Sequence, residues 1–283
     1  MSFLKTAVIF YTGNVCSTPL TQAFKKISGF EVPIHEHLDK YWIQARLEQA
    51  DISHTFNQAL RDIVDHQESA LLEKLRIQLP EAQSEYLAFK WRPFSGAESV
   101  VSERQKLFEE INAVPFLMLR GSIVNQAVKI ALSEKLNGTR HMQFSAAKMS
   151  EYEYQERLED SKKARTALSA REDIEPIVRN FFARSKETLN LAQKYFPTTP
   201  INIVKSEDLF TPLLEESVFL KYFSNKLGLN ISSFVSSSEE IIARKLGYSK
   251  ENCINYEEIF RDPMLMKLEE RYVSLFIEGR NGR

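Results

Sequence analysis

Short apolar runs recur along the chain, and segments whose apolar residues have helical spacing stand between them. A run without polar interruptions is typical of a strand buried on both faces of a parallel sheet. Strands separated by helices form βαβ units, so the pattern predicts an α/β fold. The expected strands are residues 7–10, the segment YLAFKWRPF that carries Lys90 and Arg92 at its end, the segment VPFLMLR that ends in Arg120, and residues 201–204.

Helical spacing predicts helices at about residues 18–28, 41–79, 101–111, 122–136 and 212–227. Ser122 is expected to cap the helix over residues 122–136, and Asn137-Gly138 is expected to end it. The densely charged segment 149–195 predicts two helices that part near residues 170–176 and form a solvated hairpin. Two further short helices are expected in the C-terminal segment, and a short extended piece in FEVPIHEHLDKYW.

Composition and charge narrow the class of protein. Of the 283 residues, 43% are hydrophobic and 27% are charged, values typical of a soluble globular protein. A net charge of −1 gives no bulk attraction for nucleic acid, so no nucleic-acid partner is expected. No stretch is long and apolar enough for a membrane span or a signal peptide. The two cysteines, Cys16 and Cys253, favour a reducing compartment, and we expect a cytoplasmic protein.

The first predicted strand runs into the segment YTGNVCSTPLTQAF, whose small polar residues lead to a helix. Free backbone N–H groups and the positive end of a helix dipole attract anions, which favours a phosphate or sulfate site here. The Lys of the usual nucleotide-binding loop is missing, which disfavours an ordinary ATPase or GTPase. A capped helix without ligand, with Ser17 or Thr18 as N-cap and Pro19 in the first turn, explains the segment equally well.

Three segments in this order resemble the P-loop sulfotransferases, especially the bacterial branch that includes the trehalose sulfotransferases. TGNVCSTPL matches that branch's turn, approximately T/S-x-R-S-G-S-T-x-L, at Thr12, Ser17, Thr18 and Leu20. RGSIVNQAVK matches R-x-D-x-V/L-x-Q-A-V-S at five positions, which are Arg120, Val124, Gln126, Ala127 and Val128. SEDLF is similar to the family's Y-E-D-L segment, with Glu207 and Asp208, and ENCINYEEI is similar to its N-Y-x-E-I/V ending.

The resemblance implies transfer of a sulfuryl group from 3′-phosphoadenosine 5′-phosphosulfate (PAPS) to a hydroxyl of a small-molecule or carbohydrate acceptor. It implies one domain over residues 1–283 with a P-loop-type three-layer α/β/α fold, a central parallel sheet, and a helical insertion or acceptor region at 138–200. No metal is expected, and a homodimer is left open. Arg120 and Lys129 would bind the 3′-phosphate, and the 5′-phosphosulfate would lie in the turn formed by Thr12, Gly13, Asn14, Val15, Cys16, Ser17 and Thr18.

Two positions depart from the family pattern. Asn14 stands where the family has Arg or Lys, and a neutral side chain cannot neutralise the charge that grows on the bridging oxygen. Lys90 and Arg92, at the end of the neighbouring predicted strand, are candidates for the missing cation. Lys129 stands where the family has Ser, and an ammonium group can contact a phosphate oxygen as readily as a hydroxyl can. Arg120 also has a plain alternative as a solvated charge at a strand end.

The resemblance also points to a general base. Glu36 in PIHEHLD matches the P-x-E setting of the trehalose-type enzymes. His35 and His37 compete with it, because imidazole titrates near neutral pH whereas a carboxylate needs partial burial to become an efficient base. We expect Glu36 to be the base, with His37 second. The segment with His141, Gln143 and Phe144 is a candidate lining of the acceptor pocket.

Two other functions remain open at this point. Asn14 favours a sulfotransferase-like protein that binds ligands without catalysis. An atypical P-loop phosphotransferase with a degenerate turn would instead be stabilised by ATP with Mg²⁺. The pair His35 and His37 is not accompanied by a set of metal-ligating residues at the usual spacing, which agrees with the expectation of no metal.

Overall fold

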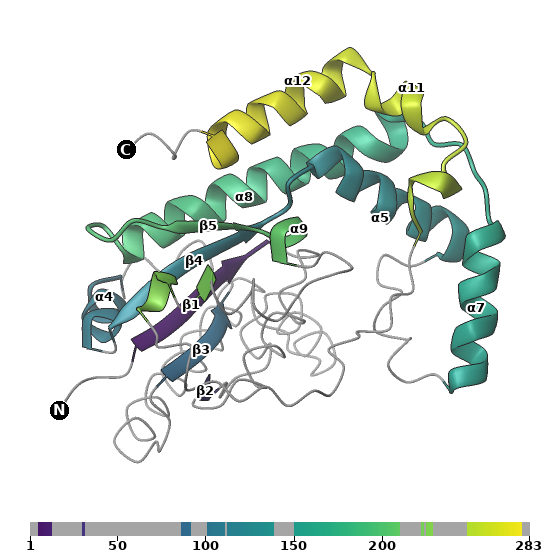
Figure 1. Ribbon diagram of the computed structural model, residues 1–283. Coiled ribbons are helices and arrows are strands. Elements are labelled where there is room, and N and C mark those ends of the chain that lie inside the picture. Colours follow the sequence, from purple (N-terminus) through teal and green to yellow (C-terminus); the bar gives the residue numbers. More distant parts are fainter. Residues whose placement is uncertain are drawn as a thin grey trace, which may run out of the picture. The chain divides into compact units, whose positions relative to one another are not determined.

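The computed structural model describes residues 5–12, 30–31, 86–91, 101–110, 112–138, 150–209, 222–223, 225–228 and 248–278 (Figure 1). The chain divides into two compact units. We call Met1–Leu119 with Ser185–Glu239 the sheet unit, and Arg120–Arg184 with Glu240–Arg283 the helical unit. The expectation of one sulfotransferase-like domain over 1–283 stays a prediction. The expected helices over 18–28 and 41–79, and most of the one over 212–227, lie outside the described residues.

The sheet unit contains a five-stranded parallel sheet with the strand order β2-β3-β1-β4-β5 (Figure 1). All four strands expected from apolar runs are present, and the short extended piece forms the edge strand β2. The parallel α/β architecture is thereby confirmed. The strands are β1 (Lys5–Tyr11), β2 (Phe30–Glu31), β3 (Tyr86–Trp91), β4 (Ala113–Leu119) and β5 (Asn202–Lys205).

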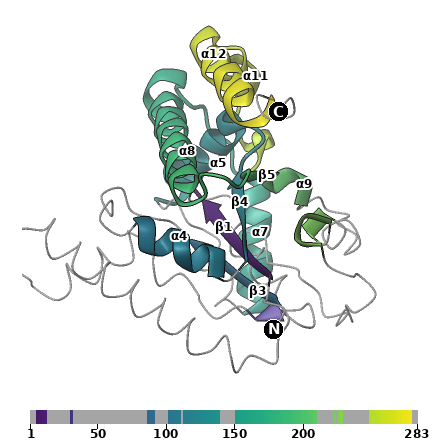
Figure 2. The same cartoon turned by 90° about the vertical axis from the view of Figure 1, so that its left-hand side faces the viewer.

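The apolar runs of β1 and β4 form the core of the sheet unit, because both faces of these strands are covered. Ile9 pairs with Phe116, and Phe10 pairs with Leu117, so Phe10 and Phe116 point to opposite faces. Phe10 contacts Phe196 just after α8 (Glu175–Tyr195), and Phe196 stacks on Phe108 of α4 (Val101–Glu110). On the other face, Phe116 contacts Phe223. Figure 2 shows α4 against the sheet, on the face to which Phe10 points.

Helix α5 (Ile123–Asn137) begins and ends as the sequence predicts. The Ser122 hydroxyl accepts a hydrogen bond from the Asn125 amide at 3.1 Å. Gly138 adopts the left-handed conformation with φ of 65°, and its N–H donates to the Glu134 carbonyl at 2.8 Å. Glycine suits this position because a side chain there would be strained.

The prediction for the charged segment was right about two helices and wrong about where they part. Helix α7 (Glu151–Lys163) ends at a six-residue break, 164–169, and a π-helical turn η2 (Ala170–Ile174) then leads directly into α8. Ser169 caps that turn by accepting from the Glu172 amide at 3.1 Å. Pro176 is the second residue of α8, and the helical backbone continues through it from the π-helical turn. Helix α7 packs against η4 (Lys250–Asn252).

The C-terminal segment of the helical unit is mostly helical. The sequence predicts two short helices in the segment 239–263, part of which lies outside the described residues. The described part contains η4 and α11 (Tyr256–Phe260), and α12 (Pro263–Tyr272) and η5 (Val273–Glu278) follow. Asp262 caps α12 by accepting from the amides of Met264 and Leu265 at 3.0 Å each. In the sheet unit, β5 is followed directly by the short helix α9 (Ser206–Leu209).

Candidate functional site

The carboxyl ends of β1 and β4 lie side by side in the sheet, since Tyr11 pairs with Met118. From β1 the chain continues to strands on one side of this pair, and from β4 it continues to β5 on the other side. Ligands of open α/β sheets bind outside the carboxyl ends of the strands, at the point where the strand order reverses in this way. The fold therefore makes the two segments that follow β1 and β4 the first candidates for a ligand-binding site.

Thr12 is the first residue after β1, and it is buried. The other predicted cofactor-binding residues of the turn, Gly13, Asn14, Val15, Cys16, Ser17 and Thr18, lie outside the described residues, as do the candidate bases Glu36, His37 and His35. The same is true of Arg92 and of His141, Gln143 and Phe144. Their roles stay predictions.

Lys90 lies inside β3, one residue before its end, and it pairs in register with Ile9. The last pair between these strands joins Phe10 and Trp91. Because β3 is the neighbour of β1 opposite to β4, Lys90 belongs to a strand whose carboxyl end lies beside that of β1. This backbone position is compatible with the predicted role of Lys90 as the replacement cation.

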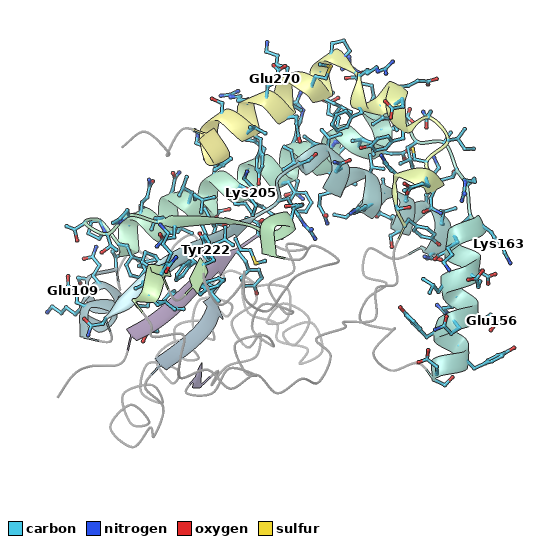
Figure 3. The ribbon with its side chains drawn as sticks, viewed as in Figure 1. Glu109, Glu156, Lys163, Lys205, Tyr222 and Glu270 are labelled. Atoms are coloured by element: carbon cyan, nitrogen blue, oxygen red, sulfur yellow. The ribbon has the colours of Figure 1, made fainter. Side chains whose placement is uncertain are left out.

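Arg120 follows β4 directly, and the strand end before it is held by a side-chain hydrogen bond. The Ser206 hydroxyl donates to the Leu119 carbonyl at 3.1 Å, and Ser206 is buried. The last register pair of β4 and β5 joins Leu119 and Lys205, so Ser206 extends the pairing by one step beyond the ladder. Figure 3 labels Lys205 at the end of β5 and Tyr222, whose hydroxyl donates to the carbonyl of Ile203 within that strand at 3.1 Å.

Ser206 and Glu207 belong to the S-E-D-L segment singled out in the sequence. The Ser206 hydroxyl also lies 3.3 Å from Glu207 Oε2, and Glu207 itself is exposed. Sequence reasoning emphasised the two carboxylates and overlooked the serine. A small hydroxyl residue directly after a buried strand is the signal that could have identified it, because such residues commonly bond nearby backbone groups.

The amides of the first four residues of α5 are hydrogen-bonded within the protein. The amides of Ile123 and Val124 donate to Glu269 Oε2 of α12 at 3.0 and 3.1 Å. The amide of Asn125 donates to the Ser122 hydroxyl, and the amide of Gln126 donates to the Ser122 carbonyl. The amides of Ile123, Val124 and Asn125 are among those that a helix leaves without an intrahelical partner, and the Gln126 bond is the first of the helix itself. The amides of these four residues are therefore already occupied, and a phosphate near them would depend on side chains.

The residues of the second motif separate into buried and exposed positions. Val124, Gln126, Ala127 and Val128 are buried, whereas Arg120 is half-buried and Lys129 is exposed. Lys129 is six residues after Ile123, about 9 Å along the helix axis. Helical side chains in general lean toward the amino terminus of their helix. The motif thus supplies one cation before the helix, a second nearly two turns into it, and a buried packing face.

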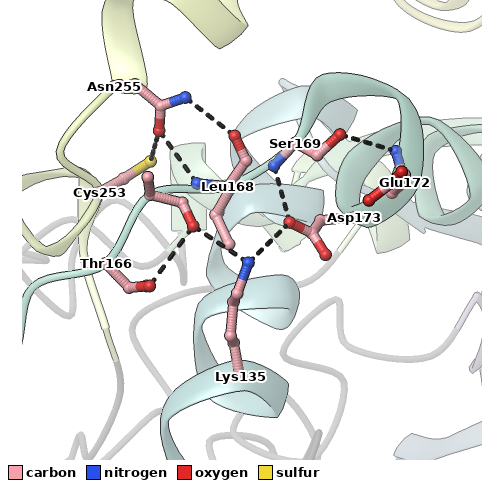
Figure 4. Close-up of polar contacts among 9 residues, drawn as sticks. Lys135, Thr166, Leu168, Ser169, Glu172, Asp173, Cys253 and Asn255 are labelled. Carbon is pink, nitrogen blue, oxygen red and sulfur yellow. Dashed lines mark hydrogen bonds and ion pairs between the residues drawn. The ribbon is translucent and has the colours of Figure 1, made fainter.

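The N-Y-x-E ending has a structural role that the sequence did not reveal (Figure 4). The Asn255 side chain accepts from the Leu168 amide at 3.0 Å and donates to the Leu168 carbonyl at 2.8 Å. The Tyr256 hydroxyl donates to Asn125 Oδ1 in the first turn of α5. Burial, followed by the nearby carboxylates of Glu257 and Glu269, raises the pKa of Tyr256, so its hydroxyl remains a donor at neutral pH.

Cys253 lies in the same cluster and is buried with a free thiol. Burial raises the pKa of this thiol, and only a thiolate is a strong nucleophile. Lys135 completes the surroundings by donating to the Ala167 carbonyl at 3.1 Å and to Asp173 at 3.2 Å. We conclude that this cluster holds the helical unit together rather than forming a reactive centre.

Within the described residues, no group of three or more His, Cys, Asp or Glu side chains is arranged to hold a metal ion. Among the helices of the same residues, none combines the length and the apolar composition that crossing a membrane requires. Comparison of the sequence with protein-family models and with curated proteins gives no match.

Proposed function

We propose that the protein is a PAPS-dependent sulfotransferase with a P-loop-type three-layer α/β/α fold. One observation carries the proposal. The two segments that resemble the family's phosphosulfate turn and 3′-phosphate motif follow β1 and β4, whose carboxyl ends are adjacent where the strand order reverses. The aromatic contacts of Phe10 and Phe116 on opposite faces of the sheet support the layered arrangement.

In this proposal the amides of residues 13–18 bind the 5′-phosphosulfate of the donor. Arg120 and Lys129 bind the 3′-phosphate through their side chains, because the first four amides of α5 already have partners in the protein. A guanidinium group offers bidentate hydrogen bonds to phosphate, and an ammonium group acts as a point charge. The two cations therefore contribute differently, and Arg120 is expected to contribute more to affinity.

The chemical step is an in-line displacement at sulfur. The acceptor hydroxyl oxygen forms a bond to sulfur while the bond from sulfur to the bridging phosphate oxygen breaks, and 3′,5′-adenosine bisphosphate leaves. Glu36 accepts the proton of the hydroxyl, and His37 is the alternative base. Lys90 or Arg92 stabilises the negative charge that develops on the bridging oxygen, a part that neutral Asn14 cannot take.

The proposal is tested by calorimetric titration with 3′,5′-adenosine bisphosphate. Arg120→Ala is expected to lower the affinity by roughly 10- to 100-fold, the loss of one charge-assisted hydrogen-bonding partner. Arg171→Ala is the matched control, because Arg171 is exposed and its guanidinium lies 3.7 Å from Glu175. Equal affinity of the wild type and Arg120→Ala, or no binding by the wild type, contradicts the proposal.

Asn14 favours a second candidate, a sulfotransferase-like protein that binds the nucleotide without catalysis. Mass-spectrometric screening of hydroxylated acceptors with PAPS separates the two candidates, because only the enzyme forms sulfated products. Glu36→Gln should lower the turnover rate by about 100-fold or more if Glu36 is the base, whereas His37→Gln should change it little. Thermal stabilisation by ATP with Mg²⁺ would instead favour an atypical phosphotransferase.

A further inference from the structure

Glu269 connects two parts of the helical unit that are far apart in the sequence. Its Oε2 atom accepts hydrogen bonds from the amides of Ile123 and Val124, 146 and 145 positions away. A carboxylate at a helix amino terminus is stabilised both by these bonds and by the helix dipole. The contact therefore joins α12 to the first turn of α5 through charge as well as hydrogen bonding.

The packing of α12 explains why Glu269 reaches α5. Leu265 and Tyr272, four residues before and three residues after Glu269, are buried on the same face of the helix. Asp262 fixes the start of α12 by capping it. A second contact comes from α11, because the Tyr256 hydroxyl donates to Asn125 in the same turn of α5. Two consecutive C-terminal helices thus hold one turn.

The turn that they hold is the one that presents Arg120. Arg120 precedes Ile123 by three residues, a separation of at most about 11 Å along the backbone. Gly121 and the cap Ser122 separate Arg120 from the helix. Arg120 thus stands in the chain between the end of β4 and the first turn of α5, and a shift of that turn changes the backbone from which its side chain extends.

We propose that Glu269 is a positioning residue for Arg120: by binding the first two amides of α5 it fixes the turn from which the Arg120 side chain extends toward an anionic ligand. The identity of that ligand, a nucleotide with a 3′-phosphate, rests on the function proposed above. The anchoring itself does not rest on it. A neutral side chain with an acceptor oxygen at position 269 can keep both hydrogen bonds, and an alanine cannot.

The experiment compares the wild type with Glu269→Ala, Glu269→Gln and the matched control Glu270→Ala, whose side chain is exposed one residue along α12 (Figure 3). Affinity for 3′,5′-adenosine bisphosphate is measured well below the unfolding midpoint, where a purely structural change leaves the folded protein's affinity unchanged. Glu269→Ala should weaken binding about tenfold. Glu269→Gln should restore it to within about threefold of the wild type, and the control should not differ from it. Equal affinity of Glu269→Ala and the wild type overturns the proposal.

Amide hydrogen exchange on the same variants tests the anchoring of α5 by Glu269 independently of the sulfotransferase function. Glu269→Ala should speed exchange at Ile123 and Val124 by about tenfold or more, without a matching change in the last turns of α5. If the wild type binds no nucleotide, the proposed function fails, and this exchange pattern alone decides the anchoring. If Glu269→Ala does not fold, Glu269→Leu takes its place, because leucine fills similar space and offers no acceptor, and the same faster exchange is expected. Unchanged exchange at the two amides in whichever of these two variants folds overturns the proposal.

Discussion

The sheet unit and the helical unit treat their buried polar groups differently. Within the described part of the sheet unit, the hydroxyls of Thr6 and Ser185 are buried and make no hydrogen bond. In the helical unit, the buried Asn252 side chain is hydrogen-bonded at both its oxygen and its nitrogen. The sheet unit is stabilised mainly by buried apolar strands, and the helical unit depends more on specific polar contacts between distant segments.

Substitution of Asn252 is the strongest test of this difference. Its amide nitrogen donates to the carbonyls of Ser161 and Ala164 at 2.5 and 2.8 Å, and its oxygen accepts from the Ser249 amide at 2.8 Å. Asn252→Ala removes one buried and two partly buried hydrogen bonds, so we expect the free energy of unfolding to fall by about 2–4 kcal/mol. Urea denaturation measures it, with Asn190→Ala, an exposed position on α8, as the control. A loss below about 0.5 kcal/mol would remove the contrast between the units.

Ser206 is an exception within the described part of the sheet unit, and it sharpens the comparison. Its buried hydroxyl donates to the Leu119 carbonyl at 3.1 Å. Ser206→Ala is expected to lower the free energy of unfolding by about 1 kcal/mol, the usual net value of one such bond. The measurement is again urea denaturation. A change as small as that of the Ser185 variant below would mean that the Ser206 bond adds no net stability.

Ser185→Ala removes a buried hydroxyl that has no hydrogen-bond partner. Because no bond is lost and alanine has the higher helix propensity, we expect unchanged stability or a gain of up to about 0.5 kcal/mol. Thermal unfolding of Ser185→Ala and Ser206→Ala, recorded side by side, gives the comparison. A clear destabilisation by Ser185→Ala would show that this hydroxyl is bonded in solution.

The smallest effect concerns the pH dependence of the helical unit. Burial raises the pKa of Cys253, so the unfolded chain loses this proton at a lower pH than the folded protein does. The stabilisation is therefore complete below the unfolded pKa, roughly 8.5, and is lost as the pH rises through the folded value. Unfolding free energies measured from pH 7 to 10 should fall less steeply for Cys253→Ala than for the wild type. Parallel slopes would contradict the shift.

The sequence predicted the elements whose signals are local. The apolar runs of β1 and β4 are visible without the structure, and so are the cap Ser122 and the terminator Gly138. The break at 164–169 was misplaced because Pro176 was given more weight than Ser169 with Glu172, a serine followed three residues later by an acid. Local helix signals of this kind compete closely, and the cap is the better guide to where a helix begins.

The contacts between distant segments of the helical unit could not be predicted in the same way. Glu269 lies in an amphipathic helix, and nothing in the local sequence distinguishes it from the other acidic residues there. Its hydrogen-bond partners are 145 and 146 residues away. The Asn255 contact with Leu168 spans 87 residues. Such contacts depend on how helices pack, and no local spacing encodes that packing.

The paired hydrogen bonds of Asn255 have a consequence for how this region tolerates change. Its carboxamide presents one donor and one acceptor to Leu168, as a neighbouring strand residue would, and it continues the bridge between Thr166 and Cys253. Asn255 must therefore stand two residues after Cys253, because Leu168 stands two residues after Thr166 on the neighbouring segment. Inserting or deleting a single residue there would shift the alignment of the two segments, although neighbouring Ile254 is largely exposed and free to vary.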